Sequence, residues 1–148
     1  MRPVMTERDG PTVRPRVFQW PVRVYYEDTD SGGIVYYANY LRFFERARTE
    51  WLRSIGVSQR RLGDDEGIQF VVTRFTIDYR ASARLDDLLE LDMDIIAARR
   101  ASLILAQRAC IEGSAQPLAT ARTIIAALSC NTGRPVGMPD WLLSRVNS

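Results

Sequence analysis

Residues 26–40 read YEDTDSGGIVYYANY, and this stretch lies between a predicted strand and a predicted long helix. Three acidic residues fall within four positions, two glycines follow, and aromatic residues then lead into an apolar helical pattern. Repulsion between neighbouring acids and the backbone freedom of glycine make this a costly way merely to connect two elements. We therefore ask what else such a turn between a strand and a helix does.

A strand and a long helix flank this turn. Residues 17–26, VFQWPVRVYY, are rich in valine and aromatic residues, as strands are, and Pro21 indicates an edge strand or a bulge. From Tyr40 to Ile55 apolar residues recur at steps of three and four, which predicts a helix. Asn39 is the expected N-cap, and Gly56 is the expected stop.

Beyond this helix the period of the apolar residues changes to two, which predicts strands. Short turns join these strands, so we expect an antiparallel sheet packed on one helix, an α+β fold with five strands. The last strand is apolar enough to be central and covered on both faces. The four later strands are expected at 69–80, 88–98, 102–112 and 118–130, and short helical segments at 58–67 and 139–146.

Length and composition suit one compact domain. The chain has 148 residues, of which 46% are hydrophobic, and we expect a flexible N-terminal tail over 1–16 and a single domain over 17–148. A net charge of +2 gives no electrostatic reason to expect binding to nucleic acid or to a membrane surface. No long apolar run or signal-peptide core is present, which predicts a cytoplasmic protein without membrane insertion.

The chain contains no histidine. This excludes Ser-His-Asp and Cys-His nucleophile systems and removes the commonest ligand of catalytic zinc. Cys110 and Cys130 show no metal-ligand spacing, so we predict no metal site and expect buried, reduced thiols, with a disulfide or redox role as the alternative. Chemistry in this chain must rest on carboxylates, backbone dipoles, arginines, tyrosines or hydroxyls.

Asp30 lies between the end of the strand and the start of the helix, next to Gly32 and Gly33. The free N–H groups of a helix start form an electropositive pocket that can hold an oxyanion. A carboxylate beside it can attack a carbonyl or activate water. The alternative is that Asp28 or Asp30 caps the helix; Glu27 and Asp28 fit this alternative as solvated turn acids.

The segment Val22–Gly56 resembles the hotdog-fold acyl-CoA thioesterases, both the YbgC branch, associated with the Tol–Pal system, and the 4-hydroxybenzoyl-CoA thioesterases. A second block, Phe70–Leu91, resembles them too, so the likeness extends from about Val17 to Cys130. The family motif is D-x-D-x-x-G-x-V, followed by an aromatic pair and N-Y or S-Y. Here its residues are Asp28, Asp30, Gly33, Val35, Tyr36, Tyr37, Asn39 and Tyr40.

The resemblance implies a hotdog fold, with the sheet wrapped around one long helix, and a homodimer or homotetramer with active sites at the subunit interface. It implies that Asp30 is the catalytic carboxylate, as nucleophile or general base, and that the backbone N–H of Tyr37 polarises the thioester carbonyl. Gly33, Val35 and Tyr36 would contact substrate. Many YbgC relatives carry histidine where Tyr37 stands, but a backbone amide survives that change.

Tyr36 and Tyr37 allow two interpretations. An aromatic wall would favour aromatic acyl groups, whereas packing at the helix start would carry no information on the substrate.

Arg99, Arg100 and Ser102 match a turn that contacts the CoA phosphates in the aryl-CoA enzymes, with Ala101 in place of a lysine. Bidentate hydrogen bonds between arginine and phosphate give a physical reason for this role. Paired arginines in a hairpin are otherwise solvated surface charge.

The sequence thus predicts a thioester hydrolase that converts acyl-CoA to free acid and CoA. No separate cofactor is implied, because CoA arrives with the substrate. Two alternatives stay open: a thioesterase acting on acyl carrier protein, and a non-catalytic acyl-CoA-binding or scaffold protein. Hotdog dehydratases fit less well, because their catalytic histidine is missing.

Overall fold

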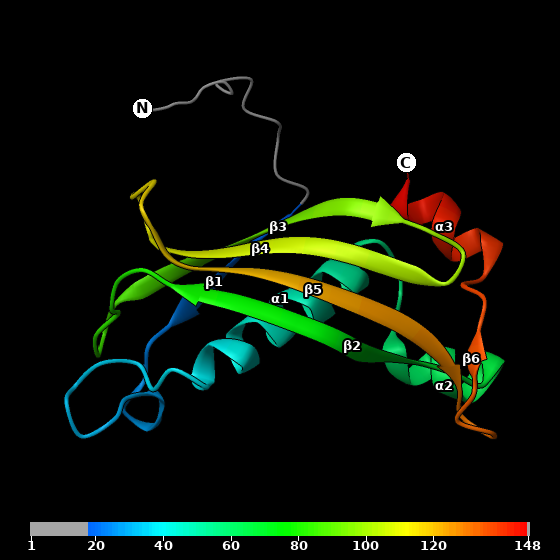
Figure 1. Cartoon of the computed structure of the whole chain (residues 1–148), viewed down its shortest axis with the longest axis horizontal. Helices are drawn as coiled ribbons and strands as arrows, with labels where there is room; N and C mark the ends of the chain where they lie inside the picture. Colours follow the sequence, from blue (N-terminus) through cyan, green and yellow to red (C-terminus); the bar gives the residue numbers. More distant parts are fainter. Residues whose placement is uncertain (1–17, 148) are drawn as a thin grey trace.

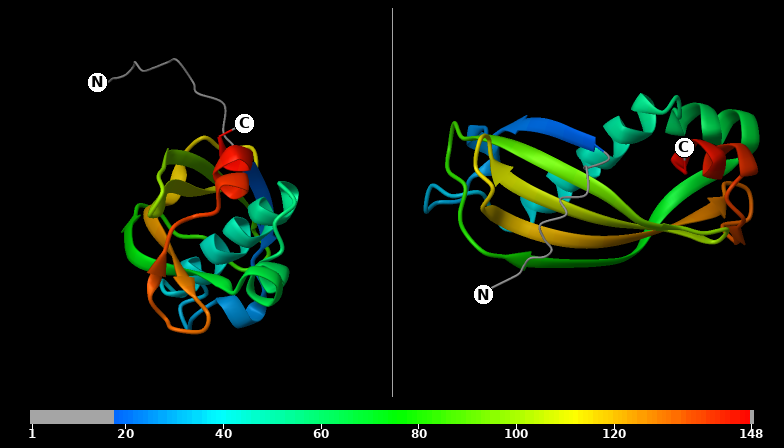
Figure 2. Two further views of the ribbon diagram at one scale, coloured as in Figure 1. Left: turned by 90° about the vertical axis from the view of Figure 1, so that its right-hand side faces the viewer. Right: turned by 90° about the horizontal axis from the view of Figure 1, so that it is seen from above.

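A computed structural model describes residues 18–147, and the tail predicted over 1–16 lies outside the described residues. One antiparallel sheet curves around one long helix, which is the predicted α+β hotdog arrangement (Figures 1 and 2). Its long strands follow the order β1-β3-β4-β5-β2, and a short sixth strand pairs with β5. The strands are β1 Phe18–Arg23, β2 Ile68–Tyr79, β3 Leu88–Ala98, β4 Ser102–Ile111, β5 Pro117–Ser129 and β6 Pro135–Val136; the helices are the 3-10 turn Tyr26–Asp28, α1 Asn39–Ser54, α2 Gln59–Glu66 and α3 Asp140–Val146.

The central helix α1 matches the predicted helix to within one residue at each end. Its apolar face is fully buried against the sheet, and Phe43, Phe44 and Ala47 are 0% exposed. It ends where predicted, since Gly56 adopts a φ of +84°, a left-handed conformation that suits glycine. The predicted N-cap is wrong. Ala38 occupies the cap position without a side-chain hydrogen bond, and Asn39 is the first helical residue.

Among the described strands β1 pairs with β3 alone, so it is an edge strand of the described sheet, as Pro21 indicated. The strand ends at Arg23, three residues before the predicted end at Tyr26. A 3-10 turn takes over there, since the backbone N–H of Tyr25 donates to the Asp28 carboxylate at 2.8 Å. The chain therefore leaves the sheet early and enters the acidic turn, residues 24–38.

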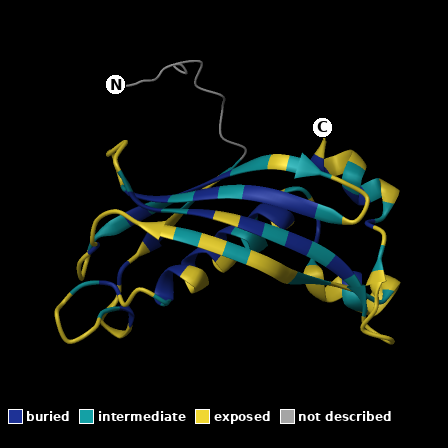
Figure 3. Cartoon of the chain, viewed as in Figure 1, coloured by how far each residue is buried: buried dark blue, intermediate teal, exposed yellow. Residues whose placement is uncertain are grey.

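β5 lies inside the sheet between β4 and β2, as predicted. The expectation that both of its faces are covered is wrong for the single chain. Its side chains alternate in burial (Figure 3), and Arg122 is exposed. A long run of small and β-branched residues hides this alternation in the sequence.

The core consists of two apolar clusters along α1. One surrounds the first half of the helix and includes Phe44 and Leu91; the other surrounds the second half and includes Trp51 and Leu105. A polar group lies at the level of Arg48, where Arg48 Nη1 donates to Oε1 of Gln107 at 3.0 Å. The helix and the sheet are thus joined by apolar packing at both ends and by hydrogen bonds between them.

The C-terminal helix α3 covers the end of α1, where Arg145 Nη1 donates to the carbonyl of Gly56 at 3.1 Å. None of the described helices is long and apolar enough to cross a membrane. Neither cysteine forms a disulfide; Cys110 is buried as expected, but Cys130 is exposed, so that half of the expectation is wrong.

Candidate active site

The acidic turn contains a small hairpin that is tied to the sheet. The Asp30 N–H donates to the Ile34 carbonyl at 2.8 Å, and the Tyr36 N–H donates to the Asp28 carbonyl at 2.9 Å. The Val35 N–H donates to Ala83, between β2 and β3, at 2.9 Å. These bonds give the turn a defined shape just before α1 begins.

Asp28 is not a solvated turn acid, contrary to the expectation. It is 7% exposed, and its two carboxylate oxygens accept from the Tyr25 N–H at 2.8 Å and from the Asn39 amide at 2.6 Å. A buried carboxylate is tolerated here because both oxygens have hydrogen-bond donors. Asp28 therefore fixes the start of α1 against the turn, while its neighbour Glu27 is exposed.

Asp30 lies at the tip of the hairpin and is exposed. Its Oδ1 accepts from the Gly32 N–H at 2.8 Å, and Oδ2 has no partner among the described residues. A Cβ on Gly32 would lie 3.2 Å from Oδ1, and Gly33 has a φ of +80°, so both glycines suit this geometry. One oxygen of the carboxylate is oriented and the other is open to a ligand.

Tyr37 lies two residues before α1. Within the part of the chain that the structure describes, its N–H has no acceptor, and its carbonyl accepts from the Tyr79 hydroxyl at 2.8 Å. Burial, and to a smaller extent the neighbouring Tyr37, raise the pKa of Tyr79 above its ordinary value, which keeps this hydroxyl a donor. Tyr79 was not among the predicted site residues, since it lies on β2, 42 positions away.

The aromatic side chains beside this amide form a short surface row. The rings of Tyr36 and Tyr37 lie 4.9 Å apart, and that of Tyr37 meets the edge of Tyr79 at 6.1 Å. Tyr36 is 49% exposed and Tyr37 is 61% exposed, so packing at the helix start leaves a large part of both rings accessible. Val35, by contrast, is 4% exposed within the core, which leaves its side chain no contact with solvent.

The arginine turn, residues 97–102, closes the hairpin between β3 and β4. The Arg99 N–H donates to the Ser102 carbonyl at 2.8 Å, and both arginines are exposed. The turn lies at the far end of the sheet from Asp30 (Figure 1). β3 has 11 residues, which is about 35 Å of strand. One chain therefore does not bring the two predicted halves of the site together.

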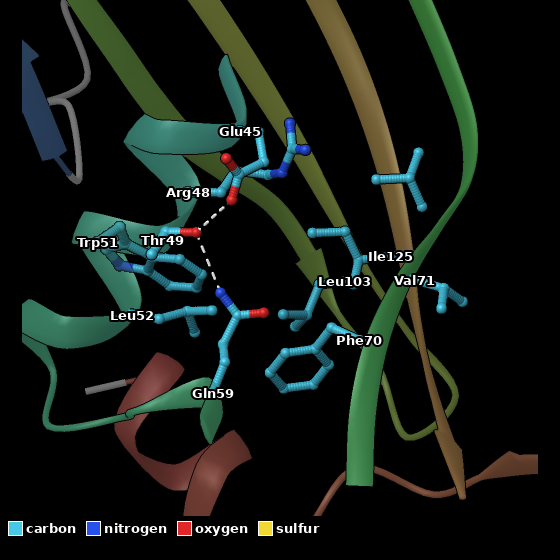
Figure 4. Close-up of a pocket in the computed structure, with 11 residues that line it drawn as sticks. Glu45, Arg48, Thr49, Trp51, Leu52, Gln59, Phe70, Val71, Leu103 and Ile125 are labelled. Atoms are coloured by element: carbon cyan, nitrogen blue, oxygen red, sulfur yellow. Dashed lines mark hydrogen bonds between the residues drawn. The ribbon is translucent and has the colours of Figure 1, made fainter. Parts of the chain in front are cut away.

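A pocket lies between α1 and β2, with Phe70, Leu103 and Ile125 among its walls (Figure 4). Polar side chains close one side of it. The Thr49 hydroxyl donates to Oε2 of Glu45 at 2.6 Å, and Nε2 of Gln59 donates to Oγ1 of Thr49 at 3.0 Å. Sequence reasoning missed this pocket. Its only signal is a pair of polar residues, Glu45 and Thr49, four positions apart on one helix face.

Across residues 18–147, no three potential ligands among histidine, cysteine, aspartate and glutamate come together as a metal site would require. What the acidic turn does offer is a carboxylate with one open oxygen, a free backbone N–H and exposed aromatic rings. Such a set can act on an electrophilic carbonyl.

Comparison with known proteins agrees with this chemistry. Residues 24–146 match the model of the thioesterase-like superfamily. An acyl-CoA thioester hydrolase YbgC from Escherichia coli O6:H1 is 54% identical over 92 residues, which cover 62% of this chain and 68% of that protein. The acyl-CoA thioesterase YbgC of Haemophilus influenzae is 42% identical over 122 residues, covering 82% of this chain and 88% of that protein.

A solved structure supports the same conclusion. A probable thioesterase from Bartonella henselae superposes with a TM-score of 0.77 at 35% identity, covering 82% of this chain and 98% of its own. With the fold, the family model and these relatives in agreement, the chain belongs to the thioesterase-like superfamily and, within it, to the YbgC acyl-CoA thioesterases.

Proposed function

We propose that the chain hydrolyses acyl-CoA thioesters to the free acid and CoA, and that Asp30 is the carboxylate that acts on the thioester. The observation that carries this proposal is the exposed Asp30, oriented through one oxygen and open at the other, in the same acidic turn as a Tyr37 N–H that has no acceptor among the described residues. Because the chain has no histidine, a carboxylate is a suitable group to act as the base or nucleophile in this reaction.

Two routes use the same groups. As general base, Asp30 takes a proton from water while the water oxygen bonds to the carbonyl carbon; the C–S bond then breaks and the proton passes to the CoA sulfur. As nucleophile, the free oxygen of Asp30 bonds to the carbonyl carbon, CoA leaves, and water hydrolyses the resulting anhydride. In both routes the Tyr37 N–H donates a hydrogen bond to the oxyanion that forms on the carbonyl. Stabilisation of a developing charge in this way is usually the largest single contribution to catalysis.

Substrate contacts follow from what is exposed around Asp30. Gly33 leaves the approach to the carboxylate open, and Tyr36 offers an exposed ring to the acyl or pantetheine part. The buried Val35 supports the turn and does not itself touch substrate. The proposal includes no metal or separate cofactor, because these groups and water balance the reaction and CoA enters with the substrate.

We propose that Arg99, Arg100 and Ser102 bind the CoA phosphates of a substrate held by a second copy of the chain. β2 has 12 residues and, among the described strands, pairs with β5 alone, so it lies at an edge of the described sheet. If two copies pair antiparallel through β2, the Ile68 end of one copy meets the Tyr79 end of the other. The arginine turn of each copy then lies at the end of the sheet that carries the partner copy's Asp30. A homodimer, or a homotetramer of two such dimers, is therefore the proposed assembly.

The cytoplasm is the compartment we propose, since neither cysteine forms a disulfide and reduced thiols persist in a reducing environment.

Thiol release from a panel of short, long and aromatic acyl-CoA esters tests the catalytic assignment. We expect turnover of some esters by the wild type and a loss of about a hundredfold or more in kcat for Asp30→Asn, which keeps the shape but removes the base. Folding should be unchanged because Asp30 is exposed. Full activity of Asp30→Asn would refute the role of Asp30.

A second variant distinguishes the proposed function from its two alternatives, a thioesterase acting on acyl carrier protein and a non-catalytic acyl-CoA-binding or scaffold protein. The variant Arg99→Ala/Arg100→Ala should bind acyl-CoA about tenfold or more weakly than the wild type, because the phosphate contacts are charge-assisted. Hydrolysis of acyl carrier protein thioesters, which lack the nucleotide, should change little. If only the carrier-protein thioester is turned over, that alternative replaces ours; binding of acyl-CoA without turnover favours the non-catalytic one.

A further inference from the structure

Arg48 in the pocket between α1 and β2 has hydrogen-bonding capacity that the proposed hydrolysis does not use. Its one hydrogen bond among the described residues goes to Oε1 of Gln107 at 3.0 Å. That oxygen also accepts from the Thr123 hydroxyl at 3.1 Å, and the Gln107 amide donates to the Phe44 carbonyl at 3.1 Å. Gln107 is thereby satisfied, whereas a guanidinium carries five N–H donors. Arg48 retains donors for a ligand.

The charge of Arg48 is also incompletely compensated. Neither ion pair found between described residues includes it. Burial lowers the pKa of Arg48, and the negative charge of Glu45 opposes this shift only in part. Arg48 is half-buried, and an oxygen atom of a ligand in the pocket can accept from its open donors.

The walls of the pocket set the size of what enters. Its volume is about 180 Å³, and Leu52, Phe70 and Ile125 give it apolar surfaces. For comparison, an engineered apolar cavity of about 150 Å³ accommodates a benzene molecule. The pocket therefore suits a hydrocarbon segment with one polar group.

The position of the pocket along α1 sets how long the ligand must be. Leu41, Glu45 and Thr49 follow one another at steps of four on one helix face, and Leu41 is 45% exposed. Measured along the helix, Glu45 lies about 12 Å and Thr49 about 18 Å from Tyr37. The exposure of Leu41 shows that this face of α1 is open at its start, while the neighbouring Phe44 packs on Phe75 of β2. A short or compact aromatic acyl group held at Tyr37 ends before the pocket begins.

We propose that this pocket receives the far end of a medium-length acyl chain, and that Arg48 selects chains bearing a neutral oxygen, a hydroxyl or keto group, far from the thioester. The inference rests on the proposed hydrolysis at Asp30. A carboxylate at that place is disfavoured, because it would also lie close to Glu45, and the two negative charges would repel each other.

The test compares decanoyl-CoA with its ω-hydroxy and ω-carboxy derivatives. In the wild type, kcat/KM for the ω-hydroxy ester should exceed that for the plain ester by about tenfold, the effect of one hydrogen bond to a charged group. In Arg48→Met this ratio should fall to about one, and Arg48→Lys, which keeps the charge with fewer donors, should give an intermediate ratio.

Arg46→Met is the matched control. It is the same substitution on the same helix, but Arg46 lies on the side of α1 that faces Trp20 and Pro21. It should keep the wild-type ratio. Equal ratios in the wild type and Arg48→Met overturn the inference, and so does a preference for the ω-carboxy ester. If Asp30→Asn retains full turnover but the Arg48 ratios hold, only the proposed catalytic residue fails.

If the wild type hydrolyses none of these esters, calorimetric affinities decide in place of rates. The ω-hydroxy ester should bind about tenfold more tightly than the plain ester, and Arg48→Met should abolish this difference. Equal affinities of the two esters for the wild type overturn the inference.

Discussion

Asp28 and Asp30 are two positions apart in the acidic turn and have opposite surroundings. Asp28 lies at the base of the hairpin, buried, with two donors on its carboxylate; Asp30 lies at the tip, exposed, with one. The burial of each residue, and not its type, therefore separates the structural role of Asp28 from the catalytic role proposed for Asp30. A sequence alone records only that both are aspartates.

Replacing Asp28 by alanine should destabilise the protein. The change leaves the Tyr25 N–H and the Asn39 amide without their acceptor, so we expect the free energy of unfolding to fall by about 2–3 kcal/mol. Urea denaturation measures this loss. The exposed neighbour gives the control, because Glu27→Ala should change stability by no more than about 0.5 kcal/mol. Equal effects of the two variants would contradict the role assigned to Asp28.

Among the elements, the open edge of β2 carries the proposed assembly. Val72 is 46% exposed near the middle of this strand, and in an antiparallel pair the two copies of Val72 come close to the two-fold axis. Val72→Asp should therefore shift the protein to a monomer, which light scattering after size exclusion measures. Hydrolysis should fall with it, since each site is proposed to need the partner copy's arginines.

Ile96→Asp is the control for this change. Ile96 is 44% exposed on β3, which already has strands on both sides. The variant should keep the pairing through β2. A Val72→Asp protein that remains dimeric, or a monomer with undiminished activity, would exclude assembly through this edge.

The periodicity of apolar residues was enough to predict α1 and the long strands, but not the short β6 or the 3-10 turn Tyr26–Asp28. The 3.6-residue pattern located α1 and the two-residue pattern located the long strands, because burial of one face dictates both. Asn39 shows what the pattern cannot give. It looks like a cap by type, yet its amide donates to Asp28 instead, and this choice depends on where the turn folds back. The pairing of Arg48 with Gln107, 59 positions away, is hidden for the same reason.

The whole molecule should respond to alkaline pH through Tyr40, which is 2% exposed. Burial, reinforced by Tyr79 and Asp87, raises its pKa above the ordinary value. The unfolded chain therefore loses this proton first, at about pH 10. The stabilisation from the neutral phenol is complete below that pH and is lost as the pH rises through the folded-state pKa.

Urea denaturation between about pH 8 and 11 measures this loss of stability. In Tyr40→Phe the decline with pH should be shallower, because the titrating group is gone. Tyr26→Phe, which changes a side chain that is 83% exposed, should decline as the wild type does. A Tyr40→Phe protein with the wild-type decline would show that other groups cause it.

The separation of Asp30 from the arginine turn has a genetic consequence. In the proposed dimer each copy gives a carboxylate to one site and arginines to the other. A copy with Asp30→Asn and a copy with Arg99→Ala/Arg100→Ala would each be defective alone. Paired with one another, they combine both defects in one site and leave the second site intact. Two inactive alleles expressed together would then complement each other.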